Sequence, residues 1–371
     1  MWKTAIKVEK RITIPLYECN SNHILLPSEL NFDMKKILIL AFALALTNFA
    51  WSQEKKYIGI AFYNLENFYD TINDPNKDDD EFTPKGKNNY SPKVFLEKVD
   101  KLAEVISIIG VDKAENGFAL LGVAEVENQD VLDVLCKHPK LRNRNLKSII
   151  FEGPDQRSID CGLIYNPTYF KMLAAQSLTV PFDSGERPTR DVLYVTGKLN
   201  GELVHVFVNH WPSRSGGEAA SRPKRKIAAS VSRKVIDSLM SIDPLTKVIV
   251  MGDLNDDPID ESVTKVLGTQ WKIDEVKKGG LYNPWTSFYK RGIGTMAYQD
   301  SWGLFDQIIV SYGFLKNNSG KLHFREAEVF NRGFMIEKDG QYKGYPKRSY
   351  SNGFWNEGYS DHYPTVIFLT K

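Results

Sequence analysis

Short apolar runs alternate with amphipathic stretches over most of this chain. Residues 57–63 form an uninterrupted apolar segment that is typical of a buried strand. Ser91-Pro92 then predicts the start of a helix, because Ser is a favoured cap and Pro suits the first helical position. The apolar residues that follow recur at spacings of four, three, four and three, as expected for one buried face of a helix. They are Phe95, Val99, Leu102, Ile106 and Ile109.

Further segments show the same alternation. The hairpin expected at residues 192–209 turns at Asn200-Gly201, and a long helix is predicted at residues 218–240. This mixture of hairpins and helices favours an α/β fold with mixed sheets over a purely parallel one. We find no linker or internal repeat, so one domain at residues 54–371 is the simplest organisation. More strands are predicted at residues 117–126, 159–165, 247–251, 305–311 and 365–369.

The N-terminal segment has a different pattern. Met34-Lys35-Lys36 precedes ten apolar residues, 37–46, and then two small residues two positions apart, Ala50 and Ser52, which together are the parts of a secretory signal. The apolar stretch is shorter than the roughly 20 residues that span a bilayer, so no stable membrane anchor is expected. We therefore expect an over-extended start at residues 1–33, a signal peptide at residues 34–52 that begins at Met34, and export to the periplasm or the medium.

Composition narrows the function only slightly. The chain has 371 residues, of which 42% are hydrophobic and 25% charged, so it can bury a large core. Its formal net charge of +2 gives no argument for a polyanionic partner, and any such charge must be local. Two cysteines of the expected mature part, Cys136 and Cys161, could pair after export or remain buried thiols. Neither has a metal-binding spacing.

Polar residues collect at the ends of the predicted strands. In α/β folds ligands bind beyond the strand ends at one edge of the sheet, so these residues are candidates for a single cleft. A carboxylate beside an imidazole can bind a divalent cation while the imidazole moves a proton. Each pair alone is more often an ordinary polar turn. The set comprises Asn64, Glu66, Glu125, Glu127, Asn209, His210, Asp253, Asn255, Asp306, Asp361 and His362.

Seven short motifs contain most of these residues, in a fixed order along residues 58–369. They are Tyr63-Asn64, Ala124-Glu125-Val126, residues 157–165, Val208-Asn209-His210, residues 252–255, Phe305-Asp306-Gln307 and Ser360-Asp361-His362. In this order the chain resembles the endonuclease/exonuclease/phosphatase superfamily, which includes deoxyribonucleases, sphingomyelinases and inositol polyphosphate phosphatases. The resemblance implies a four-layer α/β sandwich of two mixed sheets flanked by helices, with residues 54–371 as a deoxyribonuclease-like catalytic domain that hydrolyses phosphoesters with Mg²⁺. Mn²⁺ and Ca²⁺ are the other candidate cations.

The resemblance also implies a metal site. Glu125 would be the main ligand, with Asn64 and Asp361 beside it, in keeping with the oxygen ligands that Mg²⁺ prefers. The Gln that usually precedes this Glu is Ala124 here. Glu127 is a competitor for the role, because residues two apart share a face of a strand.

The implied catalytic roles fall on the remaining motifs. Asp253 and Asn255 would orient or deprotonate the attacking water. His362, oriented by Asp306, would contact the phosphate or act as its acid–base partner, and His210 would stabilise the phosphate or assist the leaving group. The predicted contacts to substrate phosphate are Asn64, Asn209 and Arg214, the last in a glycine-flanked loop.

Residues 208–217 and the segment from Gly294 to Gln307 look most like bacterial extracellular nucleases of this superfamily. This resemblance implies an exported, Mg²⁺-dependent nuclease that acts on DNA, with RNA as a further candidate substrate. The alternative is a lipid-headgroup phosphodiesterase of the sphingomyelinase type, or a sugar-phosphate phosphatase, that uses the same site. A non-catalytic binding module is a third class, but the intact set of acidic residues and both histidines argues against it. No obligate protein partner is indicated.

Overall fold

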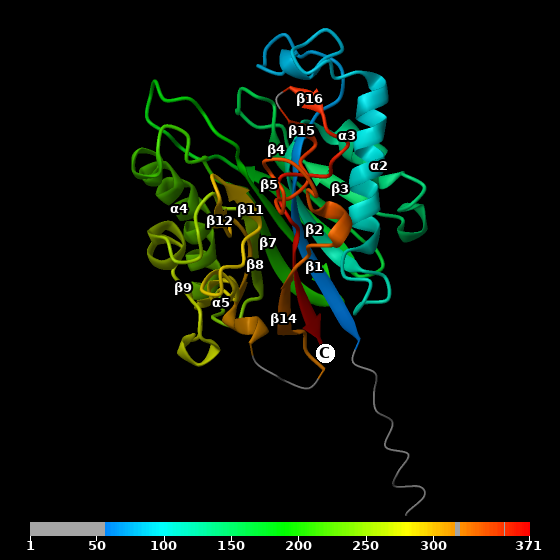
Figure 1. Cartoon of the computed structure of the whole chain (residues 1–371). Coiled ribbons are helices and arrows are strands. Elements are labelled where there is room, and N and C mark those ends of the chain that lie inside the picture. The colour runs from blue at the N-terminus through cyan, green and yellow to red at the C-terminus, as the bar shows by residue number, and fades with distance from the viewer. Residues whose placement is uncertain (1–55, 316–319, 352) are drawn as a thin grey trace, which may run out of the picture. The chain divides into compact units, whose positions relative to one another are not determined.

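The computed structural model describes residues 56–315, 320–351 and 353–371 (Figure 1). The expected over-extended start at residues 1–33 and the signal peptide at residues 34–52 lie outside these residues. None of the helices in the described ranges is both long enough and apolar enough to cross a membrane. Lys55–Lys371 form one compact unit.

Two mixed sheets form the centre of this unit. The first has the strand order β14-β17-β1-β2-β4-β3, and the second has the order β5-β6-β7-β8-β13-β10-β9. The strands of the first are β1 (Tyr57–Phe68), β2 (Phe118–Val126), β3 (Lys147–Ile150), β4 (Asp160–Tyr165), β14 (His323–Val329) and β17 (Thr365–Thr370). Those of the second are β5 (Phe170–Leu178), β6 (Val192–Leu199), β7 (Glu202–His210), β8 (Val248–Asp253), β9 (Thr269–Gln270), β10 (Leu281–Tyr282) and β13 (Asp306–Ser311).

Helices cover the outer faces of the two sheets. Figure 1 shows α2 (Pro92–Ile108) and α3 (Gln129–Cys136) on the side of the first sheet, and α4 (Glu218–Ile242) on the side of the second. The predicted four-layer α/β sandwich is therefore confirmed. The remaining elements are short: α5 (Trp285–Tyr289), the hairpins β11–β12 (Met296–Tyr298, Ser301–Gly303) and β15–β16 (Tyr350–Ser351, Phe354–Trp355), and the single turns η1 (Asp80–Phe82), η2 (Arg142–Arg144), η3 (Ser262–Val266), η4 (Ile273–Glu275), η5 (Tyr312–Phe314) and η6 (Gly333–Met335).

The alternation of side chains along each central strand builds two cores. On β8, Ile249 and Met251 join the core between the sheets, whereas Val248 and Val250 join the core beneath α4. A strand buried on both faces has a continuous apolar run instead of an alternating pattern, and this short run is what located β8 in the sequence.

Most predicted elements are present with shifted ends. The cap of α2 is confirmed, since the Ser91 side chain accepts a hydrogen bond from the Val94 amide. The hairpin turn is confirmed too, with both Asn200 and Gly201 at positive φ (47° and 89°). β1 is five residues longer than predicted, so Asn64 lies inside it. The hydrophobic pattern of the sequence did not predict α3, β3, β5 or β14.

The two cysteines left open by the sequence are free in this structure. Cys136 lies at the end of α3 and Cys161 lies on β4, and both are buried. Burial raises the pKa of the Cys136 thiol to about 12, which keeps it protonated and unreactive at neutral pH.

Candidate active site

The register of the second sheet brings three predicted catalytic residues into one row. β7 and β8 are parallel with His210 opposite Asp253, and β13 runs antiparallel to β8 with Asp306 opposite the same Asp253. Residues in register on neighbouring strands point to the same face. The convergence expected from the sequence is therefore a direct result of strand pairing.

His362 and Asp306 form the tightest contact of this row. The Nδ1 atom of His362 lies 2.7 Å from Oδ2 of Asp306, and its Nε2 atom lies 3.8 Å from Oδ2 of Asp253. Burial lowers the pKa of His362, but the charges of Asp306 and Asp253 and the hydrogen bond to Asp306 outweigh burial and raise it well above its usual value. His362 is therefore an imidazolium that its two acidic neighbours hold in place.

His210 lies on the other side of Asp253 and is in the opposite charge state. Its Nε2 atom is 3.7 Å from Oδ2 of Asp253 and 3.9 Å from Oε1 of Glu125. Burial lowers its pKa well below the usual value, and the nearby cations Arg190 and Arg157 lower it further. One neutral and one charged imidazole thus flank a single carboxylate, an arrangement that separates the roles of base and acid.

Asp253 is held between these rings by two hydrogen bonds. The Nδ2 atom of Asn64 donates to Oδ2 of Asp253 at 3.1 Å, and the backbone N–H of Asn255 donates to its Oδ1 at 3.0 Å. Burial raises its pKa to about 6, although the charge of His362 acts in the opposite direction. A carboxylate with a pKa near neutrality is suited to accept a proton from water.

Glu125 joins the cluster and Glu127 does not. Glu125 is in the left-handed region (φ 59°), within a register shift of β2 against β4, so the alternation of side chains is broken there. Its Oε2 accepts from the Asn67 amide at 2.8 Å, whereas the carboxylate of Glu127 accepts from the Asp70 amide at 2.6 Å. The rule that residues two apart share a face fails at this bulge, and position favours Glu125.

The sequence matches the Endonuclease/Exonuclease/phosphatase family over residues 59–371. The chain belongs to this family. No curated protein sequence matches it. As a member of the endonuclease/exonuclease/phosphatase family with its acidic and imidazole groups assembled at one site, the chain is a phosphoric ester hydrolase.

Solved structures of the family share this fold. TDP2 of D. rerio, complexed with a single-strand DNA product, has a TM-score of 0.51 at 13% identity, with 85% of this chain and 99% of that chain covered. A mannosyl-6-phosphatase of Bacteroides thetaiotaomicron has a TM-score of 0.51 at 14% identity, over 84% and 99% of the two chains. A family protein of the same organism has a TM-score of 0.51 at 15% identity, over 86% and 96%.

Family enzymes depend on a divalent metal, and the donor chemistry of this site fits one. The carboxylates of Glu125 and Asp361 remain partly exposed (17% and 28% of each side chain), and oxygen ligands with room for water suit a hard cation. Asp253, Asp306 and His362 also lie within 4.8 Å of one another. Asp306 and His362 are more deeply buried, however, so the more exposed Glu125 and Asp361 are the better candidates for a cation that keeps bound water.

Asn64 is oriented as a hydrogen-bond donor to the acidic cluster. Its Oδ1 accepts from the Glu66 amide at 2.9 Å, which turns its Nδ2 toward Asp253 and toward Oε1 of Glu125, 3.4 Å away. This orientation does not support the predicted role of Asn64 as an oxygen ligand of the metal. It positions the carboxylates instead, and its Nδ2 is also the atom that could contact a substrate phosphate.

Asn209 lies on the opposite face of its strand. Its Oδ1 accepts from Trp211 Nε1 at 3.1 Å and from Ser232 Oγ at 3.0 Å on α4, and its Nδ2 donates to the Met251 carbonyl. The predicted phosphate contact is therefore corrected: Asn209 ties β7 to the helix. Because neighbours on a strand face opposite ways, the period-two rule already separates Asn209 from His210.

Arg214 has carboxylate partners in this structure. Its Nη2 lies 2.9 Å from Asp260 and 3.2 Å from Asp257, its Nε donates to the Asn255 carbonyl at 2.9 Å, and its guanidinium stacks 4.5 Å above the ring of Phe305. Arg214 thus fixes the loop after β8 that carries Asn255. Its predicted contact with phosphate would require it to leave these partners.

Two residues that contact the predicted site residues were not themselves predicted from the sequence. The Arg348 Nη2 atom donates to Oδ2 of Asp361 at 2.7 Å, and the Ser360 hydroxyl donates to the Asn64 carbonyl at 2.7 Å while it accepts from the His362 amide. Arg348 lies in a loop with no periodic pattern, so no local signal could identify it. Ser360 was visible only as part of its motif.

Proposed function

We propose that this chain is a Mg²⁺-dependent phosphodiesterase that hydrolyses DNA, with RNA as a second candidate substrate. The observation that carries the proposal is the position of Asp253 between neutral His210 and the His362 imidazolium. A general base, a charged proton donor and a neutral hydrogen-bond donor within one cluster are groups that suit phosphoester hydrolysis.

Each side chain has a defined task in this proposal. Asp253 takes the proton of the attacking water, and the Asn255 amide keeps the carboxylate oriented through its 3.0 Å hydrogen bond. As the phosphorus–oxygen bond breaks, the His362 imidazolium gives its Nε2 proton to the leaving oxygen, which balances the water proton that Asp253 takes, and Asp306 keeps that imidazole charged before the step. Neutral His210 donates a hydrogen bond to a phosphoryl oxygen. When bound through Glu125 and Asp361, Mg²⁺ supplies positive charge to the phosphoryl oxygens.

A plasmid-nicking assay tests this function. Purified protein from Gln53 onward is incubated with supercoiled plasmid and Mg²⁺, with EDTA and the variant His362→Ala in parallel. Nicking that requires the metal and disappears in the variant supports the proposal. Intact plasmid in every lane, together with phosphate released from small esters, would move the substrate to the alternative class.

One feature favours a sugar-phosphate phosphatase as the second candidate. A cavity of about 800 Å³ borders Asp361 and Arg348, and Tyr298, Tyr342 and Tyr345 line it. Aromatic faces beside amide and carboxylate groups suit a polyhydroxylated group next to the phosphate. Release of inorganic phosphate from hexose phosphates without nicking of DNA would support this candidate, and release of phosphocholine from sphingomyelin would point to the lipid enzyme.

We further propose that the enzyme is exported through a signal peptide at residues 34–52. The charged start, the short apolar stretch and the small residues Ala50 and Ser52 support this proposal. N-terminal sequencing of protein recovered from the periplasm or medium should find a mature start near Gln53. Full-length protein retained in the cytoplasm would contradict export.

A further inference from the structure

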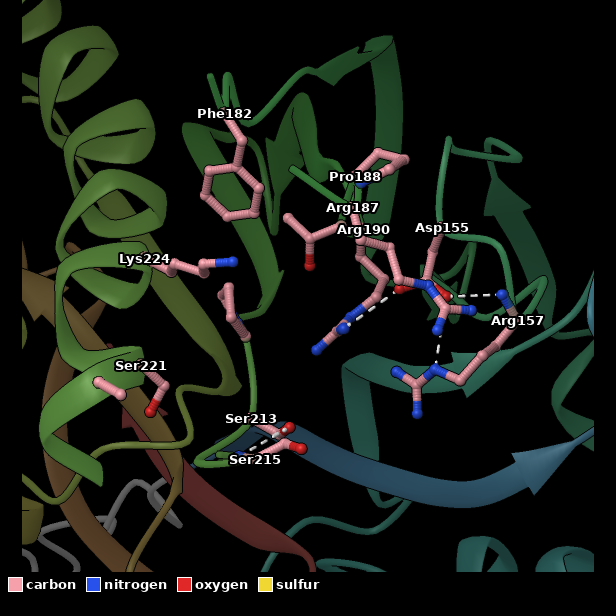
Figure 2. Close-up of a pocket in the computed structure, with 13 residues that line it drawn as sticks. Asp155, Arg157, Phe182, Arg187, Pro188, Arg190, Ser213, Ser215, Ser221 and Lys224 are labelled. Atoms are coloured by element: carbon pink, nitrogen blue, oxygen red, sulfur yellow. Dashed lines mark hydrogen bonds and ion pairs between the residues drawn. The ribbon is translucent and has the colours of Figure 1, made fainter. Parts of the chain in front are cut away.

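A basic pocket, shown in Figure 2, is lined in part by the loop that follows β7, the strand that ends at His210. It is a cavity of about 520 Å³ whose wall includes Pro212 and Ser213, directly after His210-Trp211. The Arg190 Nη2 atom donates to the Trp211 carbonyl at 2.6 Å, and the same carbonyl accepts from Nδ2 of Asn255 at 2.9 Å. The pocket is therefore joined to the two strand ends that carry His210 and the Asp253 loop.

The lining of this pocket is strongly cationic. Arg157, Arg187, Arg190 and Lys224 line it together with a single carboxylate, Asp155. The whole chain has a formal net charge of only +2, so this concentration of positive charge is local. It lies beside an acidic centre, and a concave surface of this kind selects an anionic group.

Two of the four cations are only loosely held. Arg187 pairs with Asp78 at 2.6 Å and Lys224 pairs with Glu186 at 3.4 Å. The side chains of these two ion pairs are between 37% and 66% exposed. Surface pairs of this kind contribute little to stability because water competes for both partners. A phosphate that enters the pocket can therefore replace these carboxylates at small cost, while the buried Arg190–Asp155 pair remains in place.

Buried donors in the pocket wall lack partners. The Thr189 hydroxyl and the Arg190 Nε atom are inaccessible to solvent and find no hydrogen-bond partner within the part of the chain that the structure describes. Both residues are 5% exposed and both line the cavity. Buried polar groups are nearly always paired in native proteins, so an acceptor bound against this wall would supply a missing partner after a small movement of the side chains that exposes these atoms.

An aromatic ring completes the lining. Figure 2 shows Phe182 and Lys224 on one side of the space, with Arg190 and Arg157 on the other. Phe182 is partly buried, and its ring centroid lies 5.5 Å from the Lys224 Nζ atom. The cavity is much larger than one phosphate needs, and an aromatic face beside cations is the usual platform for a nucleobase next to its phosphate.

We propose that this basic pocket binds a second phosphate of the substrate, adjacent to the phosphodiester that is cut, with Phe182 stacking on the attached base. The inference rests on the proposed nuclease function and deepens it. Binding of a second phosphate in this pocket makes the enzyme selective for polynucleotides over substrates with a single phosphate. Arg187, Lys224 and Thr189 contact the second phosphate, and none of the three takes part in the chemical step.

The test compares a dinucleotide with one phosphate, TpT, with the tetranucleotide TpTpTpT. Wild-type enzyme should show a KM for the tetranucleotide about tenfold lower than for TpT. In Arg187→Gln and Lys224→Gln, the tetranucleotide KM should rise about tenfold and its salt dependence should weaken by about one unit of slope per cation removed. Cleavage of TpT should stay within about twofold of wild type.

A matched variant separates the pocket from bulk charge. Arg222→Gln removes a cation from the same helix as Lys224, at a position that pairs with Glu218 and does not line the cavity. Arg222→Gln should leave the KM of both substrates unchanged. Phe182→Leu should raise the KM of the tetranucleotide only. Equal losses for Arg222→Gln, or equal effects on both substrates, would overturn the pocket proposal. Unchanged melting temperatures confirm that the variants fold.

The two proposals can fail separately. If neither oligonucleotide is cleaved by wild-type enzyme, the nuclease function fails. Fluorescence anisotropy with a labelled TpTpTpT then still decides the pocket: weaker binding by Lys224→Gln than by Arg222→Gln supports it, and equal binding contradicts it. If inorganic phosphate competes as well as the tetranucleotide, the pocket is a simple anion site and the role of Phe182 is overturned.

Discussion

Asp253 is the residue on which the two imidazoles of the site converge. Burial lowers the pKa of both rings, but the charges of Asp306 and Asp253 and the hydrogen bond to Asp306 outweigh burial at His362, whereas the cations Arg190 and Arg157 add to its effect at His210. The same residue type thus acquires two different chemical roles from its surroundings.

Removal of the imidazolium should abolish most activity. In His362→Ala, kcat should fall at least about a hundredfold, because the cation that faces the phosphate is lost. Asp306→Asn should also lower kcat, since an amide cannot stabilise the charge of His362. Steady-state kinetics measures both, with His323→Ala on β14 as the control and circular dichroism to check the fold. Near-normal turnover in His362→Ala would remove that residue from the mechanism.

The two glutamates at the end of β2 should differ in their effect on metal dependence. Glu125→Gln should raise the Mg²⁺ concentration needed for half-maximal activity at least about tenfold, because it removes a charged oxygen ligand. Glu127→Gln should change it less than about twofold, since that side chain faces the Asp70 loop. Titration of activity with Mg²⁺ compares the variants, and the reverse ranking would assign the metal to Glu127.

At the scale of elements, the close pairing of β7 and β8 positions the catalytic row. Gly252 precedes Asp253, and a Cβ atom at this position would overlap the carbonyl oxygen of Asn209 on the neighbouring strand. Only a residue without a side chain allows the two strands to pair at the point where His210 faces Asp253.

Gly252→Ala should therefore lower both stability and activity. The strands must separate to admit the methyl group, which shifts His210 relative to Asp253 and reduces kcat by more than about tenfold. Thermal melting and kinetics measure the two effects. Gly333→Ala is the matched control, because a Cβ there meets nothing within 4 Å. A Gly252→Ala enzyme with wild-type melting and turnover would show that the strand spacing is not critical.

A bulge near the end of β2 also determines which glutamate lies in the site. β2 was predictable as a strand from its apolar run, but the left-handed conformation of Glu125 was not. A single residue with positive φ shifts every following side chain, so a rule based on regular alternation fails beyond it.

At the scale of the whole molecule, buried acids make stability depend on pH. Asp160 on β4 is 2% exposed, and burial raises its pKa from 3.8 to about 7, although its Oδ2 accepts from the Gly153 amide at 2.9 Å. Because its pKa is higher in the folded state, that state holds the proton between about pH 4 and pH 7. The contribution of Asp160 to stability therefore declines as pH rises through this window.

Asp160→Asn should remove this decline. The variant should melt about 5 °C above wild type at pH 8 and close to wild type at pH 4, because the amide carries no charge to bury. Calorimetry across this pH range in the absence of metal measures the difference, with exposed Asp183→Asn as the control. A constant difference between variant and wild type at all pH values would contradict the assignment.

The molecule also separates its charges in space. An acidic centre suited to a cation lies beside the basic pocket, and the net charge of +2, summed over the whole chain, reveals neither. Composition therefore gave no hint of the pocket. Arg157, Arg190 and Lys224 come from three separate segments that only the fold brings together.

The sequence by itself determined most of the central strands, the helices α2 and α4, and the identity of most residues in the catalytic cluster. These features rest on local patterns: apolar periodicity, a Ser-Pro cap, an Asn-Gly turn and short motifs at strand ends. Even the convergence of His210, Asp253 and Asp306 follows from strands whose ends the sequence marked.

Only the tertiary structure decided how those residues act. In the folded chain, Arg214 pairs with Asp257 and Asp260, and Glu127 lies outside the cluster. The surroundings of His210 and His362 shift their pKa values in opposite directions. The reason is physical: burial, backbone bulges and charges from distant segments act over contacts that no local pattern records. Hydrophobic periodicity fixes which face of a strand is buried, but not which charges will meet there.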